Sequence, residues 1–220
     1  MSWQALSVPL GLLGSLGVFV FGLKTLSEAL QKVGGSSLKA MLARRPRGPL
    51  QAVGTGLLST SVVLSSSATS VMVVGFVAAG MLSLSEAIGM LMGANIGATL
   101  IGWLVAGLGF RMDIASFALP VAGVGFAMGF MRGARVRQWG EVLLGFGLLF
   151  LGLDFLMGTL PPAGSPEQLA WLGRLADPGA RTLGVFVLIG AVVTVVLQSS
   201  AATLSFTLAL AALGWLPYPV

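Results

Sequence analysis

The chain has 220 residues, of which 56% are hydrophobic and only 9% are charged, and its mean hydropathy is +0.97. Soluble domains carry about 25% charged residues, so this composition indicates an integral membrane protein. The sequence contains no His and no Cys, which excludes Ser-His catalysis, disulfides and thiolate metal sites. The net charge of +5 does not indicate nucleic-acid binding, because the basic residues lie mainly in short connections between apolar runs.

The chain divides into six apolar segments, which we expect to be helical. In order they cover residues 8–30, 50–80, 84–108, 114–131, 139–160 and 182–216. The basic connections 31–49 and 132–137 contain no acidic residue and are predicted to lie in the cytoplasm. The polar, proline-containing connection 161–181 is predicted to lie outside.

The segment 50–80 has no charged residue and carries three consecutive serines, Ser65, Ser66 and Ser67, near its centre. Three apolar segments separate the two cytoplasmic connections, and an even number of crossings requires that one of the three does not cross. Cut at Ser65, this segment gives two arms of about 15 residues, short of the ~20 that a span needs. We therefore predict a re-entrant helical hairpin from the cytoplasmic side, whose break is buried in protein or lines a water-filled cavity.

The last segment, 182–216, repeats this hairpin at a constant offset in the numbering. The offset aligns Ser65 with Ser199, Ser66 with Ser200 and Gly56 with Gly190, and it also aligns Thr60 with Thr194, Thr69 with Thr203 and Gly80 with Gly214. Two like hairpins that enter from opposite faces form an inverted-topology repeat, as in many secondary transporters. We expect a first repeat over residues 1–131 and an incomplete second repeat over residues 132–220.

The serine-rich breaks predict an anion site. A helix that begins inside the membrane presents free N–H groups and the positive end of its dipole, and serine hydroxyls add further donors. Neither hairpin contains Lys or Arg, so we expect co-bound cations to balance the charge of the anion. Oxygen ligands for such cations are available around both breaks on Thr60, Thr69, Asn95, Thr194, Gln198 and Thr203.

The sequence Gly93-Ala-Asn-Ile-Gly97 admits two interpretations. Its glycine spacing is that of a close helix-packing face. Alternatively, Asn95 between two glycines marks a second unwound element that contributes to the site. We predict the second arrangement, a discontinuous helix over residues 84–108 that is broken at residues 93–97.

Three motifs carry a resemblance to the type II family of sodium-dependent phosphate cotransporters, bacterial branch. They are residues 65–76, residues 93–97 and Gln198-Ser-Ser-Ala-Ala-Thr203. The resemblance implies that Ser65, Ser66, Ser67, Ser199 and Ser200 bind inorganic phosphate, and that sodium is bound by Thr60, Thr69, Gln198, Thr203 and Asn95. The chain departs from the family pattern at Leu64, where the family has Gln, and at Ala201, where it has Ser. It also stops before a second Gly-Ala-Asn-Ile-Gly element.

The predicted function is sodium-coupled symport of inorganic phosphate by a multi-pass, all-α protein of the bacterial inner membrane. We expect no enzymatic activity, no cofactor, no metal beyond the coupled sodium and no nucleic-acid partner. The lipid bilayer is expected as its surroundings, and a homodimer or a missing C-terminal segment is expected. A longer chain or a partner chain would supply the missing element of the second repeat. The chain alone is therefore expected to insert without transporting phosphate. Alternatives are another small anion, a membrane module that needs a partner chain, and an intramembrane serine hydrolase, which the absence of His disfavours.

Overall fold

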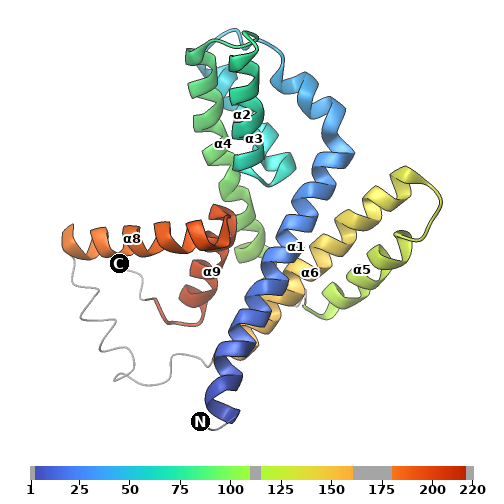
Figure 1. Ribbon diagram of the computed structural model, residues 1–220, viewed down its shortest axis with the longest axis vertical. Helices are drawn as coiled ribbons and strands as arrows, with labels where there is room; N and C mark the ends of the chain where they lie inside the picture. The colour runs from blue at the N-terminus through green and yellow to red at the C-terminus, as the bar shows by residue number, and fades with distance from the viewer. Residues whose placement is uncertain (1–2, 110–114, 161–179, 217–220) are drawn as a thin grey trace.

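The computed structural model describes residues 3–109, 115–160 and 180–216. Within these ranges every regular element is a helix (Figure 1), which agrees with the predicted all-α class. The elements are α1 (Trp3–Leu42), α2 (Pro49–Val63), α3 (Ser66–Ala78), α4 (Leu84–Leu104), the π-helix η1 (Val105–Gly109), α5 (Ala115–Met128), α6 (Ala134–Thr159), α8 (Ala180–Leu197) and α9 (Ser200–Ala212).

Three of the described helical stretches are long and apolar enough to cross a membrane. They are Ser7–Leu42, Leu84–Gly109 and Ala134–Thr159. Within the described residues, helix α5, which we predicted as a span over residues 114–131, covers 14 residues from Ala115 to Met128. The described part of α5 is thus shorter than the roughly 20 helical residues of a full span, and residue 114 lies outside the described residues. The predicted outer connection 161–181 lies outside the described residues except at its last two positions.

Helix α1 is longer than we predicted. It continues to Leu42 through residues that we interpreted as a basic cytoplasmic loop beginning at Gln31. The extension is stabilised by packing, because Leu38 and Leu42 lie one turn apart and are both buried in an apolar cluster with residues of α2, α3 and α4. Tertiary contacts thus override the loop-like composition of Gly34-Gly-Ser-Ser37.

Helix α4 is continuous, so the break predicted at residues 93–97 is wrong. The two glycines serve the close packing of α4 on α2. A Cβ atom on Gly93 would overlap the carbonyl oxygen of Val53, and one on Gly97 would approach the carbonyl oxygen of Leu57 within 2.5 Å. The irregular part of this segment comes later, where the five-residue π-helix η1 follows α4.

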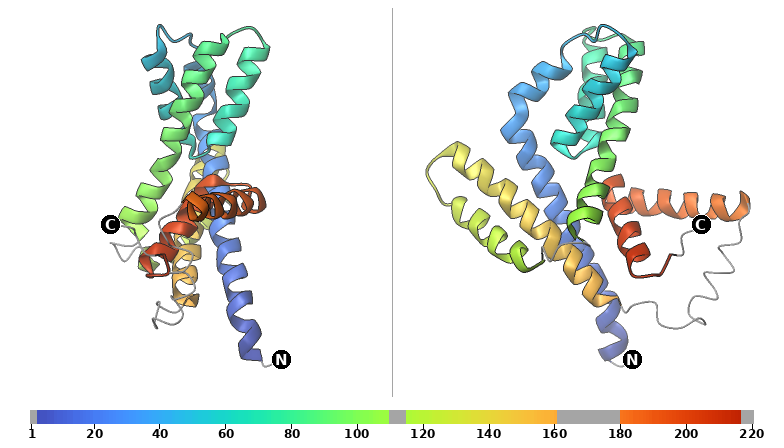
Figure 2. Two further views of the ribbon diagram at one scale, coloured as in Figure 1. Left: turned by 90° about the vertical axis from the view of Figure 1, so that its left-hand side faces the viewer. Right: turned by 180° about the vertical axis from the view of Figure 1, so that it is seen from behind.

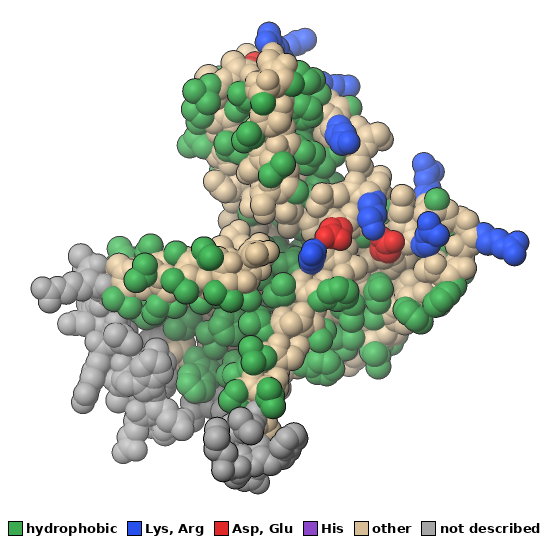
Figure 3. Space-filling view, in the orientation of Figure 1, with side chains coloured by type: hydrophobic (Ala, Val, Ile, Leu, Met, Phe, Trp, Pro, Cys, Tyr) green, Lys and Arg blue, Asp and Glu red, His purple; other side chains and the backbone are tan. Residues whose placement is uncertain are grey.

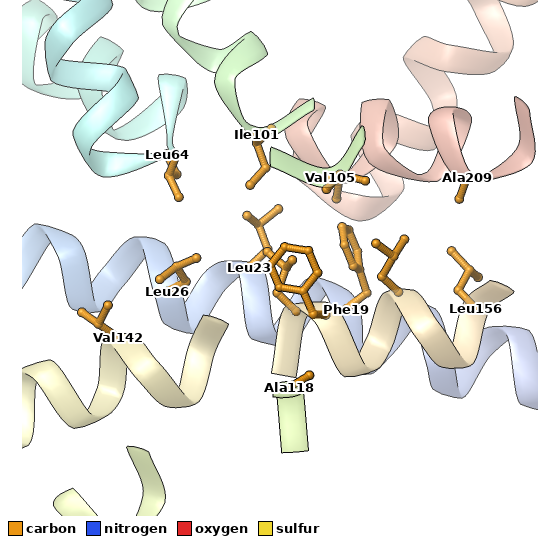
Figure 4. Close-up of a cluster of buried hydrophobic side chains, with 14 of the residues drawn as sticks. Phe19, Leu23, Leu26, Leu64, Ile101, Val105, Ala118, Val142, Leu156 and Ala209 are labelled. Carbon is orange, nitrogen blue, oxygen red and sulfur yellow. The ribbon is translucent and has the colours of Figure 1, made fainter. Parts of the chain in front are cut away.

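The remaining helices are arranged around α1 and α6, which pack along each other, while α5 lies against α6 (Figures 1 and 2). A core cluster lies where α1 and α6 meet α4, η1 and α9. In Figure 4, Leu64 from the end of α2 and Ile101 from α4 point toward Leu23, Leu26 and the aromatic side chains of this cluster. The break between α2 and α3 is therefore held against the middle of α1.

Helix α8 extends away from the rest of the described chain (Figures 1 and 2). Its described side chains are mostly apolar and exposed, including Leu183, Val187, Val195 and Val196. No charged residue occurs in the sequence between positions 183 and 216. In Figure 3 the charged side chains lie at the top, centre and right of the view, and none is seen along the described outer part of α8.

Candidate functional site

The first break lies between α2 and α3 and is confirmed where the serines predicted it. Helix α2 ends at Val63, and Leu64 then adopts the left-handed conformation with φ 55° and ψ 27°. Ser65 is extended and serves as the N-cap of α3, because its Oγ accepts a hydrogen bond from the backbone N–H of Ala68 at 3.2 Å. A non-glycine residue in the left-handed region is uncommon, and such residues often mark functional sites.

The second break, between α8 and α9, has the same local geometry. Gln198 is left-handed with φ 53°, and Ser199 is the extended N-cap of α9. The Oγ of Ser199 accepts a hydrogen bond from the N–H of Ala202 at 3.2 Å. The distal ends of α3 and α9 also correspond, with positive φ at Gly80 and Gly214. The correspondence between the two hairpins in the sequence therefore extends to their backbone conformation.

A pair of threonines lies next to each break. In the first hairpin, the Oγ1 atoms of Thr60 and Thr69 are 3.0 Å apart and both side chains are fully buried. The Oγ1 of Thr69 also donates to the carbonyl oxygen of Ser65 at 3.2 Å. In the second hairpin, Thr194 and Thr203 repeat the pair, again with 3.0 Å between their Oγ1 atoms. Each pair joins the two arms of its hairpin by a side-chain hydrogen bond and concentrates hydroxyl and carbonyl oxygens behind the break.

The two breaks face one cavity of about 400 Å³. The first hairpin contributes Leu64 and the three serines Ser65, Ser66 and Ser67, and the second contributes Leu197, Gln198, Ser199, Ser200 and Ala201. All five serines predicted to bind phosphate, together with Gln198, thus line a single space although they come from distant parts of the sequence. This convergence could not be deduced from either hairpin alone.

Helix α1 forms another wall of the cavity, which the sequence interpretation missed. It contributes the polar side chains of Lys24, Ser27, Glu28 and Gln31. Their spacing of three and four residues places them on one helix face, and this signal was available in the sequence. Ser27 is buried, and its Oγ donates to the carbonyl oxygen of Val63 at 2.8 Å, satisfying a backbone acceptor at the end of α2. Gln31 in turn donates to Ser27 at 3.3 Å.

The presence of Lys24 corrects an assumption of the sequence analysis. We inferred coupling to cations from the absence of Lys and Arg in the hairpins, but α1 brings an ammonium group to the cavity. Its Nζ lies 3.9 Å from Oε1 of Glu28. Among the described residues these two are the only charged ones that line the cavity, so the lining has no net formal charge. A bound multivalent anion therefore still lacks net compensation from these side chains.

The other predicted ligands take different positions. The two threonine pairs lie behind the breaks rather than in the cavity lining. Asn95 is exposed on α4 and does not line the cavity, because the helix that we expected to unwind there is continuous. The structure therefore does not bring Asn95 to the other predicted ligands.

At each break, the positive end of one helix dipole lies next to the negative end of another. Helices α3 and α9 begin there, and the free N–H groups of their first turns favour anions. Helices α2 and α8 end there, and their terminal carbonyl groups favour cations. The arrangement is chemically suited to hold an oxyanion and one or more small cations close together.

Comparison with known proteins agrees with the family resemblance that the sequence motifs carry. The profile of the Na+/Pi-cotransporter family matches residues 18–158. The chain is 29% identical over 213 residues to YjbB of Escherichia coli (strain K12), named as a putative inorganic phosphate export protein, covering 96% of the chain and 38% of YjbB. It is 31% identical over 186 residues to the uncharacterized protein YqeW of Bacillus subtilis (strain 168), covering 83% of the chain and 57% of YqeW.

One relative, from rat, is named as a sodium-dependent transporter. The chain is 37% identical over 105 residues to the sodium-dependent phosphate transport protein 2A of Rattus norvegicus, which covers 47% of the chain and 16% of that protein. The chain thus spans well under half the length of YjbB and of the rat transporter. No solved structure matches the chain. The family match over residues 18–158, which includes the first serine motif, confirms the predicted resemblance, and the chain belongs to the Na+/Pi-cotransporter family.

Proposed function

We propose that the chain forms the substrate-binding part of a secondary transporter that moves inorganic phosphate together with sodium across the bacterial inner membrane. One observation carries the proposal: two hairpin breaks with the same capping geometry face a single cavity that contains all five predicted phosphate ligands. The family match supports phosphate as the transported anion.

In this proposal, phosphate is held between the first turns of α3 and α9. The backbone N–H groups at the start of each helix and the hydroxyls of Ser65, Ser66, Ser67, Ser199 and Ser200 donate to its oxygens. Ser65 and Ser199 already accept hydrogen bonds from Ala68 and Ala202, and their hydroxyl protons can point to the anion. Recognition by neutral donors allows release, because no single contact is very strong.

Sodium is proposed to bind next to each break. The paired threonine hydroxyls, Thr60 with Thr69 and Thr194 with Thr203, concentrate oxygens beside the cavity, and the amide of Gln198 adds an oxygen in the lining. Oxygen donors of this kind suit a hard cation. The proposed sodium site does not include Asn95, because α4 is continuous at this residue and Asn95 does not line the cavity.

We further propose that the hairpins are re-entrant and enter from opposite faces, as two inverted repeats over residues 1–131 and 132–220. The support is the shared geometry of the two breaks and the short arms of α2, α3 and α9, which have 15, 13 and 13 residues. The fully buried Thr60 and Thr69 agree with a break that is enclosed by protein.

Export of phosphate is a second candidate, because YjbB, whose match covers 96% of the chain, is named as a putative phosphate export protein. Labelled phosphate movement in proteoliposomes of known orientation distinguishes the two. The full-length natural protein is reconstituted with sodium or with choline outside. Uptake that requires external sodium supports symport, and efflux that is independent of the sodium gradient supports export. Absence of phosphate movement in both directions contradicts both candidates.

A further inference from the structure

The cavity contains a charge pair that the proposed function does not use. Lys24 and Glu28 both come from α1 and line the cavity beside the serines of both breaks. Their side chains are well exposed, at 72% and 54%, although the helix that carries them is long and apolar enough to span the membrane. Ionisable residues in such helices are costly and usually face a water-filled cavity. The exposure of the two side chains and their place in the cavity lining both indicate that the pair interacts with what the cavity binds.

A second ion pair on α1 gives a comparison. Lys32 donates to Oε2 of Glu141 on α6 at 2.6 Å, so this pair joins two helices through a short, charge-assisted hydrogen bond. The Nζ–Oε1 distance of the Lys24–Glu28 pair is 3.9 Å, which is beyond hydrogen-bonding distance, and both groups lie on the same helix. The Lys24–Glu28 pair therefore links α1 to none of the other described helices, and its ammonium group remains available to a ligand.

An anion in the cavity changes the balance of this pair. The ammonium group of Lys24 carries the positive charge of the lining, and Glu28 cancels it. A divalent phosphate ion carries more charge than one carboxylate and has more acceptor oxygens, so it competes with Glu28 for Lys24. When it succeeds, the negative charge of Glu28 is left without its partner in the same cavity as the anion.

We propose that Lys24 is a phosphate-binding residue and that Glu28 is its internal counterion, which bound phosphate displaces. This inference rests on the proposed function of the cavity and adds to it a charged residue outside both serine motifs. Displacement links the two ions, because the released carboxylate and the anion repel each other until a cation enters. Glu28 thereby makes phosphate binding depend more strongly on sodium.

The test measures equilibrium binding of inorganic phosphate to the purified full-length protein over a range of sodium concentrations. Lys24→Gln is expected to weaken phosphate binding about tenfold or more, the scale of losing a hydrogen bond to a charged group. Lys24→Arg keeps the charge and should bind within about threefold of the unmodified protein, since a guanidinium also donates to phosphate. Glu28→Gln should bind phosphate more tightly at low sodium and show a flatter sodium dependence.

A double variant separates contact with the anion from simple repulsion. In Lys24→Gln alone, the unpaired Glu28 repels phosphate whether or not Lys24 touches it. In the Glu28→Gln background this repulsion is absent, and Lys24→Gln should still weaken binding about tenfold. Unchanged binding in that background would overturn the assignment of Lys24 as a ligand.

Lys32→Gln is the matched control, because it neutralises a lysine of the same helix whose partner Glu141 lies outside the cavity lining. It should lower the melting temperature and leave phosphate affinity unchanged. If Glu28→Gln weakens binding as much as Lys24→Gln, Glu28 positions Lys24 rather than competing for it, and the counterion role is contradicted. If the unmodified protein binds no phosphate, both this inference and the proposed function fail. If Lys24→Gln binds normally while Ser66→Ala does not, this inference fails alone.

Discussion

The breaks of the two hairpins have the same backbone geometry, but the two hairpins are packed differently. In the first, α2 packs along α4, and a Cβ on Gly56 would overlap the carbonyl oxygen of Met90. In the second, the equivalent residue of α8 is Gly190, and nothing described lies within 4 Å of the position of its Cβ. Even so, Leu64 and Gln198 have nearly the same φ, and both N-cap serines make the same 3.2 Å hydrogen bond.

This difference shows which features are local. A hydroxyl N-cap, a left-handed residue before it and a threonine pair across the break are enough to form it, because they recur where none of the described helices packs against Gly190. The glycine at position 190 fits the same sequence pattern but has no described contact that requires it. Packing against a further helix is therefore an addition to the hairpin rather than its cause.

The largest expected effect is on the glycines. Gly56→Ala should lower the free energy of unfolding in detergent by about 2–3 kcal/mol, because the new Cβ would overlap the backbone of α4. Gly190→Ala adds the same atom in open space and should be neutral or slightly stabilising, since alanine favours helix. Denaturant unfolding followed by circular dichroism measures both. Equal destabilisation would mean that α8 packs against another element in the protein as purified.

The serines should respond alike in the two hairpins, because both sets line the cavity. Ser66→Ala and Ser200→Ala should each weaken phosphate binding by about 1–3 kcal/mol. Ser59→Ala is the control, since its hydroxyl is already bonded to the carbonyl oxygen of Thr55 at 2.7 Å and does not line the cavity. Isothermal titration with phosphate measures the three affinities. Equal losses at Ser59 and Ser66 would assign the hydroxyls to packing.

The left-handed positions give the sharpest asymmetry, since Leu64 has no polar group and Gln198 has an amide. Gln198→Leu should abolish the sodium dependence of phosphate binding. Leu64→Gln should raise apparent sodium affinity, and it should also lower the melting temperature, because Leu64 packs in the core cluster. Phosphate binding measured at several sodium concentrations tests both. Normal sodium dependence in Gln198→Leu would remove the second hairpin from the cation site.

The smallest expected effect concerns the threonine pairs. Thr60→Val replaces one hydroxyl of a fully buried pair by a methyl group and should cost about 1 kcal/mol of stability. Thr194→Val should cost less, because Thr194 is only partly buried. Thermal unfolding compares them, and sodium titration reports whether either pair holds a cation. A larger loss of stability at Thr194 would contradict the burial of the two hairpins.

The breaks were predictable because their signal is local. A serine run in an uncharged apolar segment, and its repeat near the end of the chain, placed both breaks correctly at Ser65 and near Gln198. The continuous α4 was not predictable in this way, since the role of Gly93 depends on the carbonyl oxygen of Val53 on another helix. The length of α1 likewise depends on the burial of Leu38 and Leu42 against distant residues.

The sequence predicted the serines that line the candidate site, but it did not predict the wall that α1 forms. The serine motifs are recognisable from the sequence, because runs of serine are unusual in uncharged apolar segments. Lys24 and Glu28, in contrast, look like ordinary charged residues near the end of an apolar segment. Their position in the cavity follows from how α1 crosses the two breaks, which is a property of the assembled fold. The helix face of residues 24–31 reveals the polar stripe, but not what it faces.

The hydrogen bond from Ser27 to the carbonyl oxygen of Val63 has a mechanical consequence. It joins the middle of α1 to the end of α2, so a buried hydrogen bond links two of the cavity walls. In the transport cycle proposed above, opening the cavity to each side in turn would slide the second hairpin past α1, α2 and α4, which packs along α2. The sliding surface includes Leu204 and Leu208 of α9 against Gly102 of α4, an apolar contact across which these side chains can move without exchanging hydrogen bonds.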